Sequence, residues 1–178
     1  PGSTIANIIN TPTGFRVYNE NFGYYSLARM DSIIGALYNA YSPSNLVDTF
    51  HIGTTVGGNT IKVIKISDNA GTDEANEPEC YFQGLQHARE AIGGSSMIFY
   101  ALYLLENYAT DIRIQNLVDN REIYIVICMN PDGWNYNLSN ITATTNGTWR
   151  KNRKPNTSPY SGTGVDLNRN WSTGWGNC

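Results

Sequence analysis

The sequence predicts a layered α/β domain built around a mixed sheet. Two observations carry this prediction: a pair of strand-like segments joined by a glycine-rich turn comes early, and apolar strands then alternate with helical segments. The chain has 178 residues, of which 40% are hydrophobic and 12% aromatic. That length and composition suit one domain with its own core and exclude intrinsic disorder.

The chain is expected to divide into an arm and a domain. Residues 1–25 are polar and rich in tyrosine, which predicts an irregular N-terminal arm, and the domain is expected to occupy 26–178. The first helix is predicted from Ser26 to Tyr41, because its apolar side chains recur at helical spacing. Ser26 is suited to cap this helix, and Pro43 follows as a stop signal.

The predicted sheet begins with an antiparallel hairpin. Residues 46–52 and 60–66 are strand-like, and Gly57-Gly58-Asn59 lies in the turn between them. Residues 80–85 form a short apolar run, which predicts a buried strand. Cys80 and Cys128 lie in apolar runs without metal-type spacing, so we expect both to be buried thiols.

The second half of the predicted fold alternates helix and strand. Residues 97–108 are apolar almost all round, which predicts a well-buried helix, and 112–118 predict a shorter one. The continuous apolar run at 122–129 predicts a central strand covered on both faces. The sequence Asn-Pro-Asp-Gly at 130–133 predicts a turn, and 135–164 are polar and predicted to form a loop.

Composition excludes several classes of function. The net charge of −3 argues against a nucleic-acid partner. The longest apolar run, 97–105, is too short to span a bilayer, so no membrane partner is expected. The absence of G-x-S-x-G, G-x-G-x-x-G and P-loop sequences argues against a serine hydrolase and a nucleotide-binding protein. The chain holds 22 asparagines against 4 lysines, which is typical of secreted proteins.

The chemistry of the chain points first to its histidines. His51 lies inside a strand pattern without acidic neighbours, which favours a structural role. His87 and Glu90 are three residues apart at the end of a strand, and imidazole and carboxylate are zinc ligands. The spacing fits half of a zinc site, but it also fits a surface histidine beside a carboxylate at a helix start.

Two further clusters carry cations. Residues 149–154 contain four cationic side chains, which fit either a substrate site or a solvated face. Within 166–170, Arg169 beside Asn168 offers a planar fork and an amide for binding a carboxylate, or an arginine that backbone carbonyls satisfy.

An acidic run lies upstream. Its residues are Asp68, Asp73, Glu74, Glu77 and Glu79. The run favours a solvated acidic turn, and its carboxylate oxygens also fit a calcium loop.

Taken together and in this order, the clusters resemble the zinc metallocarboxypeptidase family, of the carboxypeptidase A, B and T type. The resemblance rests on H-A-R-E at 87–90, N-P-D-G at 130–133, W-R-K-N-R at 149–153 and D-L-N-R-N at 166–170. The segments at 65–74 and 121–126 are similar to the bacterial carboxypeptidase T branch in particular. The family fold implies three layers, α/β/α, around a mixed and mainly parallel central sheet.

The resemblance implies a zinc-dependent exopeptidase that releases amino acids from peptide or protein C-termini. His87 and Glu90 would bind Zn²⁺, and Arg153 would stabilise the oxyanion. Asn168 and Arg169 would bind the terminal carboxylate. Arg89 and Arg150 would line neighbouring substrate positions. The calcium-stabilised bacterial branch also keeps a Ca²⁺ role open for the acidic run.

The family's third zinc ligand and general base have no matching position in this sequence. His51 is expected in the first strand, away from the site. We therefore expect the chain to be the N-terminal half of the catalytic domain and to hydrolyse little alone. The missing C-terminal half would come from the same chain or a second chain. The alternative is a non-catalytic remnant of the fold that binds peptide carboxylates.

Overall fold

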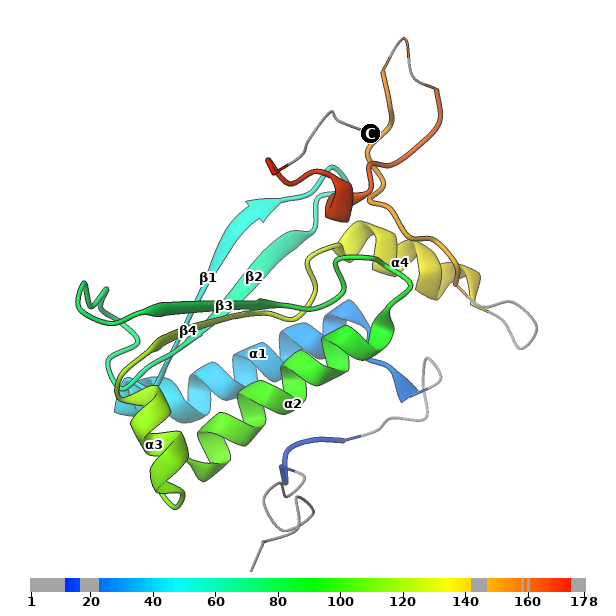
Figure 1. The fold of residues 1–178 in the computed structure, drawn as a ribbon. Helices are drawn as coiled ribbons and strands as arrows, with labels where there is room; N and C mark the ends of the chain where they lie inside the picture. The colour runs from blue at the N-terminus through cyan, green and yellow to red at the C-terminus, as the bar shows by residue number, and fades with distance from the viewer. Residues whose placement is uncertain (1–11, 17–22, 142–146, 158, 160, 174–178) are drawn as a thin grey trace, which may run out of the picture.

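The computed structural model describes residues 12–16, 23–141, 147–157, 159 and 161–173 (Figure 1). In chain order, its helices and strands are α1 (Leu27–Tyr41), β1 (Val47–Thr54), β2 (Thr60–Ile66), β3 (Glu79–Gln83), α2 (Ala91–Asn107), α3 (Ile112–Val118), β4 (Glu122–Val126) and α4 (Pro131–Asn140). Two short 3-10 helices, Ser42–Ser44 and Leu167–Arg169, complete the described elements.

The four strands form one mixed sheet in the order β1-β2-β4-β3, which confirms the predicted class of fold. β1 and β2 are the expected antiparallel hairpin, β2 and β4 are also antiparallel, and β3 and β4 are parallel. The parallel majority expected for the family sheet is not found among these four strands, because β2 runs antiparallel to both of its neighbours.

The core lies between the sheet and the first two long helices. α1 and α2 lie side by side across one face of the sheet (Figure 1). Ile64 of β2 and Ile125 of β4 point into this core and are fully buried. On the opposite face, Phe50 is 41% exposed and Tyr81 is 49% exposed. In the described part of the chain, helices therefore cover one face of the sheet and leave apolar side chains on the other.

Local signals account for the start of α1. The Ser26 hydroxyl accepts a hydrogen bond from the Arg29 backbone N–H at 3.2 Å, as the cap prediction requires. Met30, Ile34 and Leu37 form its buried face.

Among the described residues, no helix combines the length and the apolar character that crossing a bilayer demands.

The predicted burial of the strand near residue 80 is wrong. β3 is an edge strand with one described neighbour, β4, and Glu79, Tyr81 and Phe82 are exposed along it. Cys80 is only half-buried, whereas Cys128 is buried as predicted. The apolar composition of the strand reflects contact on one face, where the Phe82 ring packs edge-on against Tyr100 of α2.

The turn predicted at residues 130–133 is also wrong, because this segment begins α4. The Asn130 side chain caps the helix by accepting a hydrogen bond from the Gly133 N–H at 3.1 Å, and Pro131 occupies the first turn. Trp134 and Asn137 are buried on the inner face. The expected loop therefore begins only after residue 140. Tertiary burial and a cap stabilise a helix whose sequence has little intrinsic helix propensity.

A buried ion pair joins β2 to β4. Lys65 is 5% exposed and Glu122 is fully buried, and the Lys65 Nζ lies 2.5 Å from the Glu122 Oε1. Glu122 also accepts hydrogen bonds from the Glu74 N–H and the Tyr124 hydroxyl, and Lys65 donates to the Thr72 carbonyl. These bonds satisfy both charges and fix the 67–78 loop against the sheet.

Asp132 anchors the hairpin turn to the start of α4. Its carboxylate accepts hydrogen bonds from the Thr55 hydroxyl (2.5 Å), the Gly57 N–H (2.9 Å) and the Asn59 amide (2.7 Å). Burial raises the pKa of Asp132, but these three bonds outweigh burial and hold it below its usual value.

Substituting Asp132→Asn is expected to lower the unfolding free energy by about 1–3 kcal/mol at neutral pH, because three donors of the hairpin turn lose a charged acceptor. The depressed pKa stabilises the fold above the ordinary carboxyl pKa, and this contribution is lost as pH falls through the folded value. Urea unfolding of the full-length proteins at neutral and acidic pH measures the effect. A gap between the two proteins that stays constant with pH would contradict this assignment.

Candidate active site

The segment between β3 and α2 brings His87 to the carboxyl end of the sheet. Close packing requires a glycine at position 84, because a Cβ there would lie 2.6 Å from the Gly93 carbonyl oxygen. Leu85 follows with a φ of 49°, a left-handed conformation that side chains rarely adopt. This tight turn carries the chain across the start of α2 and buries His87, which is 5% exposed.

The structure brings the predicted metal pair together. The His87 Nδ1 lies 2.9 Å from the Glu90 Oε1, and the His87 Nε2 lies 3.0 Å from the Asp166 Oδ1. The Glu90 side chain is 54% exposed, so the pair opens to solvent.

This donor set fits a zinc ion. If the imidazole proton sits on Nε2, where Asp166 accepts it, Nδ1 is an unprotonated donor atom facing a carboxylate oxygen. A proton on Nδ1 or a metal ion between the two atoms satisfies this contact, and imidazole with carboxylate is a zinc ligand set.

Asp166 is the residue of this site that the sequence analysis missed. Its second oxygen, Oδ2, accepts a hydrogen bond from the Arg150 Nε at 2.8 Å, and the Asn168 N–H donates to Oδ1 at 3.0 Å. Burial raises the pKa of Asp166, but the bonds from Arg150, His87 and Asn168 outweigh it and lower the pKa to about 2. The only signal in the sequence was its place two residues before Asn168.

The predicted carboxylate-binding residues lie beside this centre. Asn168 and Arg169 are exposed on the 3-10 turn that Asp166 caps. The Arg150 Nη1 lies 3.8 Å from the Glu90 Oε1, and Arg89 is exposed next to His87. The structure thus places the Arg150 side chain and the Asn168 N–H on one carboxylate, that of Asp166, whereas the Arg169 Nη1 donates to the Asn168 carbonyl at 3.0 Å. The roles of these residues toward substrate stay predictions.

Arg153 is placed differently from the other predicted residues. Its guanidinium lies over the Tyr136 ring at 3.9 Å and the Trp149 ring at 4.3 Å. Stacking of a guanidinium on aromatic faces is favourable because the rings carry negative charge on their faces. In this conformation Arg153 packs against α4 rather than beside the His87–Glu90 pair.

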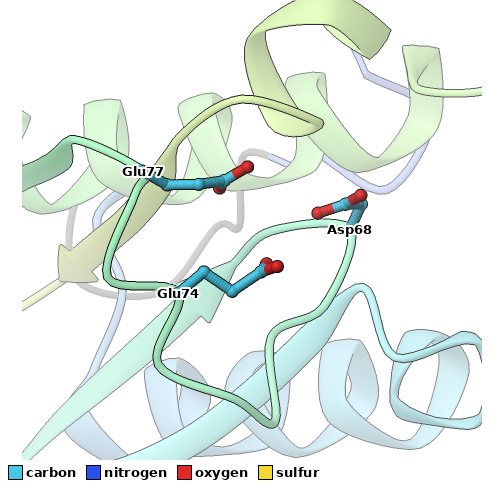
Figure 2. Close-up of side chains that lie close together, drawn as sticks. All are labelled: Asp68, Glu74 and Glu77. Carbon is cyan, nitrogen blue, oxygen red and sulfur yellow. The ribbon is translucent and has the colours of Figure 1, made fainter.

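The acidic run forms two clusters. Asp68, Glu74 and Glu77 offer oxygens within 4.8 Å of one another, and Figure 2 shows these carboxylates around one space inside the loop. Asp73 and Glu79 group with Glu122 in the same way.

In the first cluster, the Oε2 atoms of Glu74 and Glu77 are buried and have no hydrogen-bond partner among the described residues. Burial, together with the charges of Glu74 and Asp68, raises the pKa of Glu77.

Comparison with known proteins gives consistent matches. A family model described as zinc carboxypeptidase matches residues 33–178. A zinc carboxypeptidase of Saccharothrix mutabilis subsp. capreolus is 40% identical over 134 residues, which are 75% of this chain and 29% of that protein. Carboxypeptidase A1 of Rattus norvegicus is 33% identical over 159 residues, 88% of this chain and 35% of that protein.

Solved structures agree with the sequence matches. The crystal structure of carboxypeptidase A from Helicoverpa armigera superposes with a TM-score of 0.72 at 27% identity, covering 90% of this chain and 38% of that one.

The chain spans about a third of the length of the two curated relatives, 29% of one and 35% of the other.

Proposed function

Because this chain belongs to the zinc carboxypeptidase family, we propose that its full-length protein releases amino acids from the C-termini of peptides and proteins. The observation that carries the proposal is the His87–Glu90 pair with Asp166 behind the imidazole. A carboxylate that accepts the other imidazole N–H in this way orients a metal-binding histidine and raises its basicity.

In this proposal His87 and Glu90 hold the zinc, and the chain's other residues position the substrate. Zinc, when bound, supplies an activated water and polarises the scissile carbonyl. Asp166 keeps the imidazole proton on Nε2. Asn168 and Arg169 bind the terminal carboxylate, which selects the last peptide bond for cleavage.

The remaining cations extend the proposed substrate site. Arg89 and Arg150 line the neighbouring positions of the peptide. Arg153 stabilises the developing oxyanion, a role that requires it to leave the rings of Tyr136 and Trp149. The third zinc ligand and the general base are assigned to the rest of the full-length domain.

That remainder is also the proposed partner of the open side of the sheet. Phe50 and Ile52 of β1 and Tyr81 of β3 expose apolar surface on the face that α1 and α2 leave uncovered. The matched part makes up 29% and 35% of the two curated relatives, so in those proteins further chain is present that could cover such a face. The asparagine-rich, lysine-poor composition supports a secreted protein.

The experiment that tests this function compares two peptides that differ only at the C-terminus. The full-length protein should release the last residue of a peptide with a free carboxylate and leave its C-terminal amide intact. A chelator should stop the release, and added zinc should restore it. Binding of the free-carboxylate peptide without release would favour the alternative, a non-catalytic carboxylate-binding remnant.

We also propose that Asp68, Glu74 and Glu77 bind calcium through their carboxylate oxygens. The buried and unpartnered Oε2 atoms of Glu74 and Glu77 support this proposal, because buried anionic oxygens are costly without a counter-charge. Burial and then repulsion from neighbouring carboxylates raise the pKa of Glu77, and a bound divalent cation would offset both effects.

Adding calcium to zinc-saturated, full-length protein is therefore expected to raise its melting temperature by several degrees, since a ligand that binds only the folded state stabilises it. Magnesium at the same concentration controls for ionic strength. Glu77→Gln should raise the melting temperature without calcium, by removing repulsion, and should weaken the calcium response. Equal calcium responses of wild type and Glu77→Gln would contradict the site.

A further inference from the structure

Two buried asparagines of α4 connect the two segments that form the site. Asn130 caps the helix and is 2% exposed, and Asn137 lies two helical turns later and is 1% exposed. We propose that both are positioning residues, which hold the metal ligand His87 in register with Arg150. This inference rests on the proposed zinc-dependent function; it gives a role to Asn130 of the N-P-D-G segment and adds Asn137, which lies outside the four motifs.

Asn137 contacts the backbone on the C-terminal side of His87. Its amide nitrogen donates hydrogen bonds to the Ala88 carbonyl and to the Trp149 carbonyl, both at 2.8 Å. Its amide oxygen accepts a hydrogen bond from the Trp149 N–H at 2.9 Å. One side chain thus joins the residue after His87 to the residue before Arg150.

Asn130 makes the matching connection on the other side. Its amide nitrogen donates to the Lys151 carbonyl at 2.9 Å and to the Gln86 carbonyl at 3.3 Å. It therefore joins the residue before His87 to the residue after Arg150. Between the two side chains, the Ala88 N–H donates to the Arg150 carbonyl at 3.1 Å.

The two asparagines hold the backbone on both sides of His87 and of Arg150. The carbonyls directly before and after His87 are each held by an asparagine of α4, and so are the carbonyls directly before and after Arg150. The helix packs tightly here, because a Cβ at Gly133 would lie 2.7 Å from both the Ala88 Cβ and the Lys151 oxygen.

Only an asparagine meets the demands of these positions. Each amide uses both of its N–H donors on two backbone carbonyls, and its oxygen accepts from a backbone N–H. Aspartate has no donor to offer, and alanine leaves the carbonyls unpaired in a buried place. The fixed backbone on either side of His87 sets the direction of Nδ1 toward Glu90 and of Nε2 toward Asp166.

The test measures zinc affinity separately from stability. Asn137→Ala and Asn137→Asp are prepared in the full-length protein, and zinc dissociation constants are measured by competition with a chromophoric chelator. Asp132→Asn is the matched control, because Asp132 is a buried side chain of the same helix that bonds only to the hairpin turn among the contacts described. Melting temperatures are recorded for all proteins without zinc.

We expect both Asn137 variants to bind zinc about 10–100-fold more weakly, which is the usual cost of losing a residue that orients a metal ligand. Asp132→Asn should lower the melting temperature and leave zinc affinity unchanged. Unchanged affinity in the Asn137 variants would overturn the proposal, as would failure of both to fold, since the amide would then serve the fold alone. Wild-type protein that binds no zinc would instead refute the proposed function.

Discussion

Substitution of His87 by alanine in the full-length protein is expected to weaken zinc binding by about 100- to 1000-fold and to abolish peptide release. Protein zinc sites bind their metal with about 10–16 kcal/mol, so one ligand of four contributes about 3–4 kcal/mol. The variant also frees Asp166, which loses the imidazole bond at 3.0 Å. Zinc content after dialysis and affinity from chelator competition provide the measurement.

The sequence supplies a matched control for this experiment. His51, the only other histidine of the 178 residues, is exposed on β1 and outside the site. His51→Ala should therefore retain wild-type zinc affinity and activity. If His87→Ala bound zinc as tightly as His51→Ala, the assignment of His87 as a metal ligand would be wrong.

The largest loss of stability is expected from Lys65→Met. This change leaves the fully buried Glu122 without its counter-ion, and breaking a buried ion pair by removing one partner costs about 3–5 kcal/mol. Lys62→Met is the matched control on the same strand. Lys62 pairs with Asp31 at 2.9 Å in an exposed position, where an ion pair contributes about 1 kcal/mol or less. Urea unfolding of both variants compares the two costs.

The sign of the pH dependence distinguishes this explanation from simple loss of packing. Burial raises the pKa of Glu122, but the bonds from Lys65, the Glu74 N–H and Tyr124 outweigh it and lower the pKa. A depressed pKa stabilises the fold above the ordinary carboxyl value, and this stabilisation is lost as pH falls through the folded value. The deficit of Lys65→Met should therefore shrink in acid. A deficit independent of pH would indicate lost packing instead.

Local signals predicted several elements of the fold. Ser26 caps α1 as expected, the glycine-rich turn joins β1 to β2, and the bounds predicted for α3, 112–118, match the structure. In each case the determining interactions lie within a few residues. His87 and Glu90 could be paired for the same reason, because they are three residues apart and the turn between them is short.

Features that depend on distant residues could not be predicted in this way. The exposure of β3 is set by which strands lie beside it, and α4 is stabilised by burial of Trp134 against residues far away in sequence, including the Tyr25 carbonyl. Asp166 was missed because its partners, His87 and Arg150, precede it by many residues. A carboxylate has no recognisable role until the side chains that face it are known.

The distance along the chain between His87 and Asp166 also bears on the order of folding. Their contact joins residues 79 positions apart, and closing such a loop costs more entropy than forming the β1–β2 hairpin. Contacts of long sequence separation are slow to form. We therefore expect the β1–β2 hairpin to form early in folding and the contact between His87 and Asp166 to form late. During synthesis, residue 166 must leave the ribosome before the proposed zinc ligand His87 can gain its carboxylate partner.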